Sequence, residues 1–235
     1  MTNFYVGLDL GQANDYTALS VLEKLQPEGE GKEHTYHIRH LERVRNLPYP
    51  QIVSKVSEML HNPALEGNAA LVVDQTGVGA PVVDLFEQAG LNPTGIMIHG
   101  GANVSKEGHK INVPKRDLVG VLQVLLQSGR FKVAAKLALG VILQQELLNF
   151  KVKIDPVTAH DSYSAWREGQ HDDLVLSAAM AAWFAEQDVV PSVGWFDADK
   201  FRERERVRNR AAEDEMRRIC GQGPAPRHMG PWSRY

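Results

Sequence analysis

Short apolar or alternating runs, separated by polar and glycine-rich turns, predict a series of strands in the first hundred residues. Runs at 4–10, 17–22 and 35–44 predict three strands, of which the first two form a hairpin. The nearly all-apolar run 69–74 is typical of a buried parallel strand, and 95–99 predicts another strand. The pattern therefore indicates antiparallel pairing early in the chain and parallel pairing later.

Helical periodicity alternates with the later strands. It predicts helices at about 50–60, 80–89, 116–128, 135–150 and 172–187. The segment 100–110 is rich in glycine and basic residues and is expected to be a loop, and short strands are expected within 151–166. The order of elements predicts an α/β fold, in which a mixed sheet with an antiparallel hairpin and parallel strands is flanked by helices.

Charge is distributed unevenly along the 235 residues. The net charge of −3 neither favours nor excludes nucleic acid, but residues 200–235 carry a net +5 and residues 1–199 a net −8. We therefore expect one domain over 1–190, followed by a charged helix and a flexible basic tail over 191–235. Such a tail fits a phosphate-binding arm, and a solvated, salt-bridged helix explains it equally well.

Three features of the sequence indicate the cellular compartment in which the protein is expected. Cys220 is the only cysteine, so no intrachain disulfide can form and a reducing compartment, the cytoplasm, is expected. Residues 1–6 contain no basic stretch before their apolar run, so a secretory signal is not expected. No apolar stretch approaches the roughly 20 residues of a membrane span, so no membrane partner is expected.

Aspartates stand where predicted strands end and where a predicted helix begins. Asp9 and Asp74 end two apolar strands, and Asp172 and Asp173 open the last apolar helix. A carboxylate among apolar residues is costly to ionise unless a cation compensates it, and hard divalent cations prefer oxygen ligands. The four aspartates therefore predict a site for two Mg²⁺ or Mn²⁺ ions that hydrolyses a phosphodiester. Each aspartate taken singly also fits a turn or a helix cap.

Four further residues are candidates for supporting the site or holding substrate phosphate. Asp15 follows the first strand and is either a turn residue or a supporting group. Lys115 and Arg116 open a helix, where positive charge is unfavourable, so they are either bound to an anion such as phosphate or an ordinary exposed pair. His171 precedes the aspartate pair and is either a surface histidine or a supporting group. The sequence contains no phosphate-loop motif and no Cys/His cluster for zinc.

Several segments together resemble the nuclease domain of phage large terminases. The resemblance covers about residues 4–187, and its most specific element is the His-Asp-Asp run that follows a glycine. The segments that carry it are 7–11 with 15–18, 72–79, 113–118 running to 129–131, 145–150 and 169–175.

The resemblance implies an RNase H-like fold and a two-metal endonuclease that cuts concatemeric viral DNA during genome packaging, in the host cytoplasm if the protein is phage-encoded. By position, Asp9 and Asp74 would be metal ligands, completed by one or both of Asp172 and Asp173. The implied partners are double-stranded DNA and a packaging ATPase, small terminase or portal protein. The sequence lacks the ATPase motor of a complete large terminase, so an excised domain, a split-gene subunit or a stand-alone relative is expected.

Three alternatives stay open at this stage. Another RNase H-like nuclease, such as a Holliday-junction resolvase, would use the same acidic set on a different substrate. The segments 9–11 and 74–79 superficially resemble the phosphate motifs of actin-like kinases and ATPases, but these proteins need two such domains and give the aspartate pair no role. A non-catalytic DNA-binding packaging protein would depend on the basic tail.

Overall fold

The computed structural model describes residues 3–11, 15–27, 29, 33–77, 80–149, 172–187, 206 and 210. The chain divides into two compact units, Met1–Asp197 and Ala198–Tyr235. The second unit is described only at Arg206 and Arg210, so the expected division at 190/191 and the charged helix and basic tail stay predictions. The short strands expected within 151–166 lie outside the described residues.

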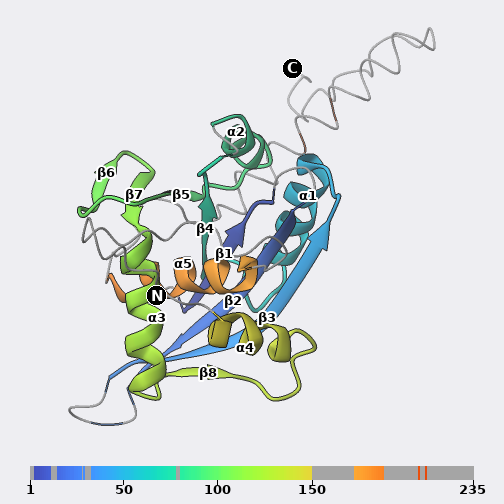
Figure 1. Cartoon of the computed structure of the whole chain (residues 1–235). Helices are drawn as coiled ribbons and strands as arrows, with labels where there is room; N and C mark the ends of the chain where they lie inside the picture. The colour runs from blue at the N-terminus through green and yellow to red at the C-terminus, as the bar shows by residue number, and fades with distance from the viewer. Residues whose placement is uncertain are drawn as a thin grey trace, which may run out of the picture. The chain divides into compact units, whose positions relative to one another are not determined.

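Within the described residues, eight strands form one mixed sheet in the order β6-β7-β5-β4-β1-β2-β3-β8 (Figure 1). Strands β1, β2 and β3 pair antiparallel, as do β6 and β7, whereas β4, β5 and β7 run parallel to β1, and β8 parallel to β3. The predicted mixed sheet with its N-terminal hairpin is thereby confirmed. The strands are β1 Phe4–Asp9, β2 Tyr16–Leu25, β3 Thr35–Arg45, β4 Ala69–Asp74, β5 Thr94–His99, β6 Ser105–Glu107, β7 Lys110–Pro114 and β8 Phe131–Val133.

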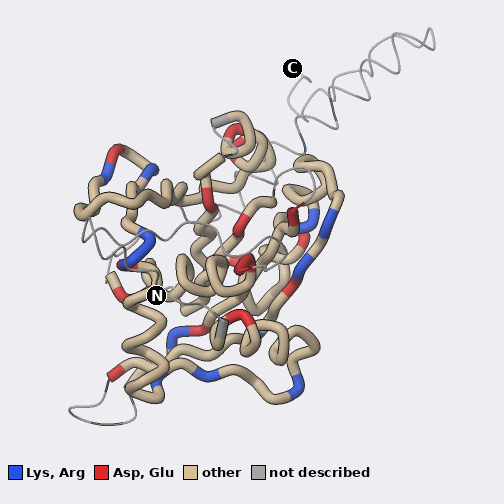
Figure 2. Tube along the Cα trace, in the orientation of Figure 1, with Lys and Arg blue, Asp and Glu red and all other residues tan. Residues whose placement is uncertain are grey.

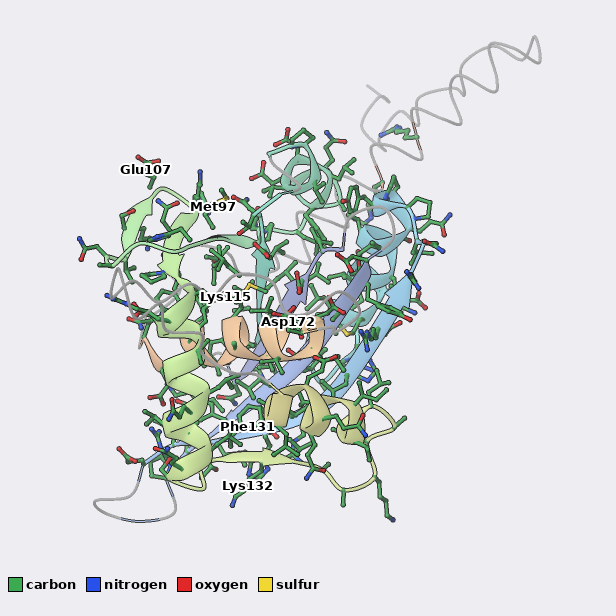
Figure 3. The ribbon with its side chains drawn as sticks, viewed as in Figure 1. Met97, Glu107, Lys115, Phe131, Lys132 and Asp172 are labelled. Atoms are coloured by element: carbon green, nitrogen blue, oxygen red, sulfur yellow. The ribbon has the colours of Figure 1, made fainter. Side chains whose placement is uncertain are left out.

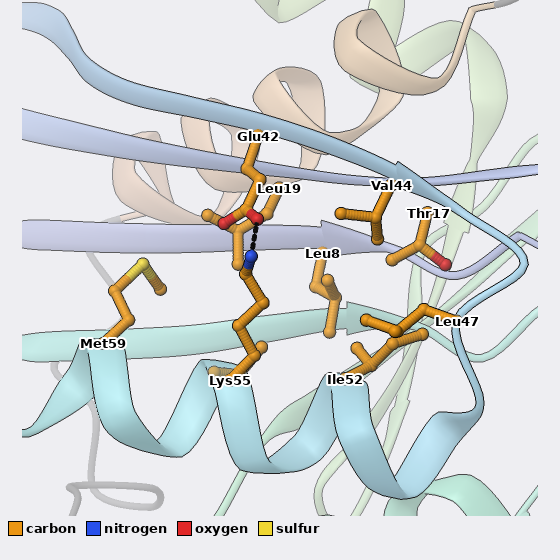
Figure 4. Close-up of a pocket in the computed structure, with 10 residues that line it drawn as sticks. Leu8, Thr17, Leu19, Glu42, Val44, Leu47, Ile52, Lys55 and Met59 are labelled. Carbon is orange, nitrogen blue, oxygen red and sulfur yellow. Dashed lines mark ion pairs between the residues drawn. The ribbon is translucent and has the colours of Figure 1, made fainter.

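Helices cover both faces of the sheet. The described helices are α1 Tyr49–Leu60, α2 Ala80–Gln88, α3 Lys115–Gln127, α4 Gly140–Asn149 and α5 Asp173–Glu186. Helix α5 packs on β1, β2 and β4, and α3 and α4 pack against it (Figure 1). Helix α1 lies on the opposite face, where Ile52 lines a pocket together with Leu8 and Leu19 of the sheet (Figure 4).

Helix α5 is apolar on all sides because it is enclosed on all sides. Twelve of its fourteen residues are buried, so it lacks the polar stripe of a surface helix. It approaches the sheet closely at Gly7, where a Cβ atom would lie 1.9 Å from the carbonyl oxygen of Ser177. Beside this contact, Tyr5 packs edge-on against Phe184. The absence of a side chain at Gly7 therefore allows the short distance between α5 and the sheet.

Two sequence-based expectations about local structure are wrong. The expected loop 100–110 contains β6 and the start of β7, joined by a turn in which Gly108 has φ +58°. All three residues of β6 are exposed, so no apolar alternation marked the strand. The helix expected over 135–150 begins only at Gly140, because residues 134–140 form turns closed by the N–H groups of Leu137 and Gly140.

None of the helices in the described parts of the chain combines the length and the apolar character needed to cross a bilayer.

Candidate metal centre

The parallel strands bring residues from distant parts of the sequence to one edge of the sheet. Asp9 is the last residue of β1, and Asp74 is the last residue of β4. The register pairs Leu8 with Val73, so Asp9 and Asp74 follow as neighbours on adjacent strands. Alternation along β1 places Asp9 on the same face as Gly7, which is the face covered by α5.

The start of α5 brings the other two aspartates to this edge. Asp172 is the N-cap residue and Asp173 is the first residue of the helix. The Nζ atom of Lys115 lies 3.3 Å from an Oδ of Asp172, and both residues are labelled in Figure 3. Lys115 is placed there because α3 begins directly after β7, which ends at the same edge as β1 and β4. Figure 2 shows acidic positions gathered where β1, β4 and the start of α5 meet.

Asp74, Asp172 and Asp173 are close enough to Asp9 to affect its ionisation. The pKa of Asp9 is raised well above its usual value, mainly by burial, and further by the negative charges of Asp74, Asp173 and Asp172. The positive charge of Lys115 partly opposes this rise. Folding therefore collects like charges around Asp9, and the ionised form of Asp9 is unfavourable without an added cation.

The Asp74 carboxylate is oriented by its own turn. The backbone N–H of Thr76 donates to an Oδ of Asp74 at 2.7 Å, and the Thr76 hydroxyl accepts the N–H of Ile98 at 2.7 Å. Burial raises the pKa of Asp74, while hydrogen bonds from Thr76 and the charge of Lys115 lower it. Thr76 thus links the carboxylate to the adjacent strand β5.

Two charged residues that were not predicted from the sequence, Arg43 and Glu146, lie at the start of α5. One carboxylate oxygen of Glu146 accepts the N–H groups of Leu174 and Val175 at 3.0 and 3.1 Å. Arg43 donates to Asp173 at 2.9 Å, and its other terminal nitrogen lies 3.4 Å from Glu146. The only sequence signal was a single acid in the apolar segment 145–150, whereas nothing in the sequence distinguished Arg43.

The pKa of Glu146 is raised to about 7, mainly by burial and also by the charge of Asp173. The backbone N–H groups of Leu174 and Val175 and the guanidinium of Arg43 act in the opposite direction. Because the pKa is raised despite these contacts, burial disfavours the ionised form of Glu146 more than the contacts stabilise it.

The three other residues that the sequence predicted for the site, Asp15, Arg116 and His171, differ in what the structure describes of them. Asp15 is exposed in the turn before β2. The guanidinium of Arg116 donates to the carbonyl oxygen of Ala102 at 2.7 Å and lies 3.5 Å from Asp117, so it contacts the loop after β5 and its own helix. His171 lies outside the described residues.

The acidic residues fit divalent cations by chemistry. Among the residues that the structure describes, no three His, Cys, Asp or Glu side chains stand close enough together to hold an ion in their present positions. Carboxylate oxygens are nevertheless the ligands that Mg²⁺ and Mn²⁺ prefer, and the mutual repulsion around Asp9 is the charge that such ions neutralise.

A pocket on the opposite face of the sheet is a poorer candidate for chemistry. It lies between α1 and strands β1, β2 and β3, and apolar side chains make up most of its lining (Figure 4). Its two charged residues, Glu42 and Lys55, form an ion pair with each other. This pocket has no group of carboxylates comparable to that around Asp9.

The central strand order β3-β2-β1-β4-β5, with β2 antiparallel to its neighbours and helices on both faces, defines the RNase H-like fold. The crystal structure of the large terminase nuclease from thermophilic phage G20c matches with a TM-score of 0.54 and 22% identity, over 76% of this chain and 80% of that chain. The expected resemblance to terminase nuclease domains is thus confirmed at the level of the fold.

Two other solved structures match more weakly. The nuclease domain of g2p, the large terminase of bacteriophage SPP1, with bound Mn, has a TM-score of 0.45 and 11% identity, over 78% of this chain and 86% of that chain. Thermus thermophilus RuvC has a TM-score of 0.40 and 16% identity, over 82% of this chain and 99% of that chain. No protein-family model and no curated protein sequence matches this chain.

Proposed function

We propose that this protein is a metal-dependent DNA endonuclease that cuts concatemeric viral DNA during genome packaging. The observation that carries the proposal is that Asp74, Asp172 and Asp173 come together around Asp9 at one sheet edge; the pKa of Asp9 is raised mainly by burial and further by these three negative charges. The matching G20c structure is that of a large terminase nuclease with the same fold. The proposed partners are double-stranded DNA and a packaging ATPase, small terminase or portal protein, and the proposed location is the host cytoplasm.

In the proposed mechanism, Asp9, Asp74 and one or both of Asp172 and Asp173 would hold two Mg²⁺ or Mn²⁺ ions. Bound ions of this kind supply activation of a water and stabilisation of the leaving 3′ oxygen. The rigid strand ends fix Asp9 and Asp74, and Thr76 fixes the orientation of the Asp74 carboxylate. Lys115, beside Asp172, offers a positive charge that can hold a scissile phosphate oxygen.

A plasmid-nicking assay with Mg²⁺ or Mn²⁺ tests the proposal. The wild-type protein should cut plasmid DNA, and chelation of the metal should stop the reaction. The variants Asp9→Ala and Asp74→Ala should lose more than the roughly 10–100-fold that loss of an outer-shell metal contact causes. Asp84→Ala, at an exposed position of α2, is the matched control and should cut normally. Undiminished cutting by both site variants would remove the mechanism.

The substrate part of the proposal needs a separate comparison. Cleavage of linear duplex DNA should equal or exceed cleavage of a four-way junction of the same sequence under the same conditions. A strong preference for the junction would instead indicate a resolvase that uses the same aspartates.

A further inference from the structure

Arg43 and Glu146 form a buried ion pair to which the proposed chemistry assigns no direct step. Their side chains are only 12% and 6% exposed, although charged side chains are rarely buried to this extent. A buried pair of this kind is weak evidence for stability, because desolvation offsets much of the attraction between the charges. Its position at the start of the helix that carries Asp172 and Asp173 points to a different role.

Glu146 takes over a task that the N-cap residue normally performs. An aspartate at the N-cap usually accepts the N–H of the second or third helical residue. Here the N-cap residue Asp172 makes no such bond, and Glu146 accepts both N–H groups, from Leu174 and Val175. The carboxylate of Asp172 is thereby directed to Lys115 and the strand ends instead of to its own helix.

Arg43 faces the start of α5 because the pairing between β2 and β3 contains a bulge. The pairing of β2 with β3 shifts between Val21 and Leu22, so that Arg39 is an extra residue in β3. Such a bulge changes which side chains face which side of the sheet. Beyond it, Arg43 pairs with Ala18, which in turn pairs with Asp9, and all three positions therefore face α5.

The guanidinium of Arg43 joins the two acids at the helix start. It donates to Asp173 at 2.9 Å, lies 3.4 Å from Glu146, and stacks with its Cζ atom 3.9 Å from the ring centre of Tyr16. The small side chain of Ala18 lies between Arg43 and Asp9 in the register. Arg43 is therefore held against the ring of Tyr16 and keeps Asp173 and Glu146 in one arrangement.

We propose that Arg43 and Glu146 are positioning residues that act as one clamp on the first turn of α5. The clamp presents Asp172 and Asp173 to Asp9 and Asp74 at the strand ends. The inference rests on the proposed function, because the clamp serves a metal centre at this edge. Neither residue touches the substrate in this scheme.

The test compares Arg43→Ala, Glu146→Ala and the double variant with the wild-type full-length protein. Three quantities are measured: amide hydrogen exchange in 172–180, Mn²⁺ affinity by calorimetry, and the rate of plasmid nicking. Each single variant should speed exchange at Leu174 and Val175 and weaken Mn²⁺ binding by roughly 10–100-fold. The double variant should lose little more than the worse single variant, since residues of one unit are not additive.

Two further variants separate positioning from general stability. Glu146→Gln keeps an oxygen for the two helix N–H groups but loses the charge that pairs with Arg43, so its exchange and affinity should lie between wild type and Glu146→Ala. Glu186→Gln is the matched control, because Glu186 binds Tyr36 and Arg130 at the opposite end of the same helix. It should leave Mn²⁺ affinity and nicking unchanged.

The possible results lead to different conclusions. Unchanged exchange in Arg43→Ala and Glu146→Ala overturns the clamp, as does faster exchange with normal Mn²⁺ affinity and normal nicking. An equal loss of affinity in Glu186→Gln also overturns it, because the effect would then be one of stability alone. If the wild-type protein neither binds Mn²⁺ nor cuts DNA, the proposed function is refuted, and the role of the clamp with it. This result is obtained from the wild-type protein before any variant is compared.

Discussion

At the scale of single residues, Asp9 shows that the protein keeps an unfavourable group where its proposed chemistry needs one. Its carboxyl group lies among three other aspartates, and its pKa is raised by burial and by their charges. A raised pKa in the folded state means that stability is lost as pH rises above the pKa of the unfolded chain. At neutral pH Asp9 therefore opposes folding, unless cations are bound.

The first residue-scale prediction concerns Asp9→Asn. Removing the charge should raise the free energy of unfolding of the metal-free protein by about 0.5–2 kcal/mol, the range usual for single stabilising substitutions. The same variant should lose metal-dependent cutting. Urea unfolding at pH 7 with a chelator measures the first effect, and plasmid nicking measures the second. Asp84→Asn should change neither quantity, and a lower stability of Asp9→Asn would contradict the electrostatic argument.

A second prediction concerns Glu146 and pH. Its pKa is about 7 in the folded protein against an ordinary value of 4.5, so its contribution to stability is present below 4.5 and is lost as pH rises towards 7. Glu146→Gln does not titrate. Relative to this variant, the metal-free wild-type protein should therefore lose stability between pH 5 and 7.5, as measured by urea unfolding. A constant difference between the two proteins over this range would contradict the raised pKa.

At the scale of elements, the contact between β1 and α5 decides where the aspartate pair lies. Gly7 and Ser177 meet so closely that no side chain fits between them. The same helix is held at its other end by Lys24, whose Nζ donates to the carbonyl oxygen of Ala185, and by the bond from Tyr36 to Glu186. The position of Asp172 and Asp173 above the strand ends thus depends on the close contact between Gly7 and Ser177.

This packing predicts the effect of Gly7→Ala. The added Cβ would lie 1.9 Å from the Ser177 carbonyl oxygen, so α5 must move away from the sheet. We expect a loss of about 1–3 kcal/mol in stability, as for other overpacked cores, and a loss of cutting. Gly120→Ala in α3 is the control, since open space surrounds that position, and it should gain about 0.5–1 kcal/mol. Equal stability of the two variants, measured by urea unfolding, would contradict the close contact.

At the scale of the whole molecule, the proposed centre joins β1, β4 and α5, which are far apart in the sequence. Cations bound there would hold these elements together only in the folded chain. Mn²⁺ at 100 times its dissociation constant should therefore stabilise the wild-type protein by about 2.7 kcal/mol. Thermal unfolding with and without Mn²⁺ measures this effect. The Asp9→Asn variant should be stabilised much less by Mn²⁺. Equal stabilisation of the wild-type protein and the variant would show that the ions bind elsewhere.

Much of the sheet followed from sequence because its signals are local. Alternation and short apolar runs located β1 to β5, and the same runs placed Asp9 and Asp74 at strand ends. The pattern failed for β6, whose residues are all exposed, and for residues 134–139, which have helix-forming side chains but adopt turns. Strand β6 is held by backbone pairing with β7, which apolar alternation does not reveal, and the turns at 134–139 are closed by backbone hydrogen bonds, which side-chain propensity does not reveal.

The sequence by itself determined the order of β1 to β5 and of the five described helices, since hydrophobic periodicity and turn-forming residues act over a few neighbouring positions. Tertiary structure alone decided that Arg43 faces α5, because one extra residue in β3 reverses the faces of the positions beyond it. It also decided that Glu146 caps a helix beginning 27 residues later, at Asp173. Such contacts depend on the distance between atoms in the folded chain, which the spacing of residues along the sequence does not specify.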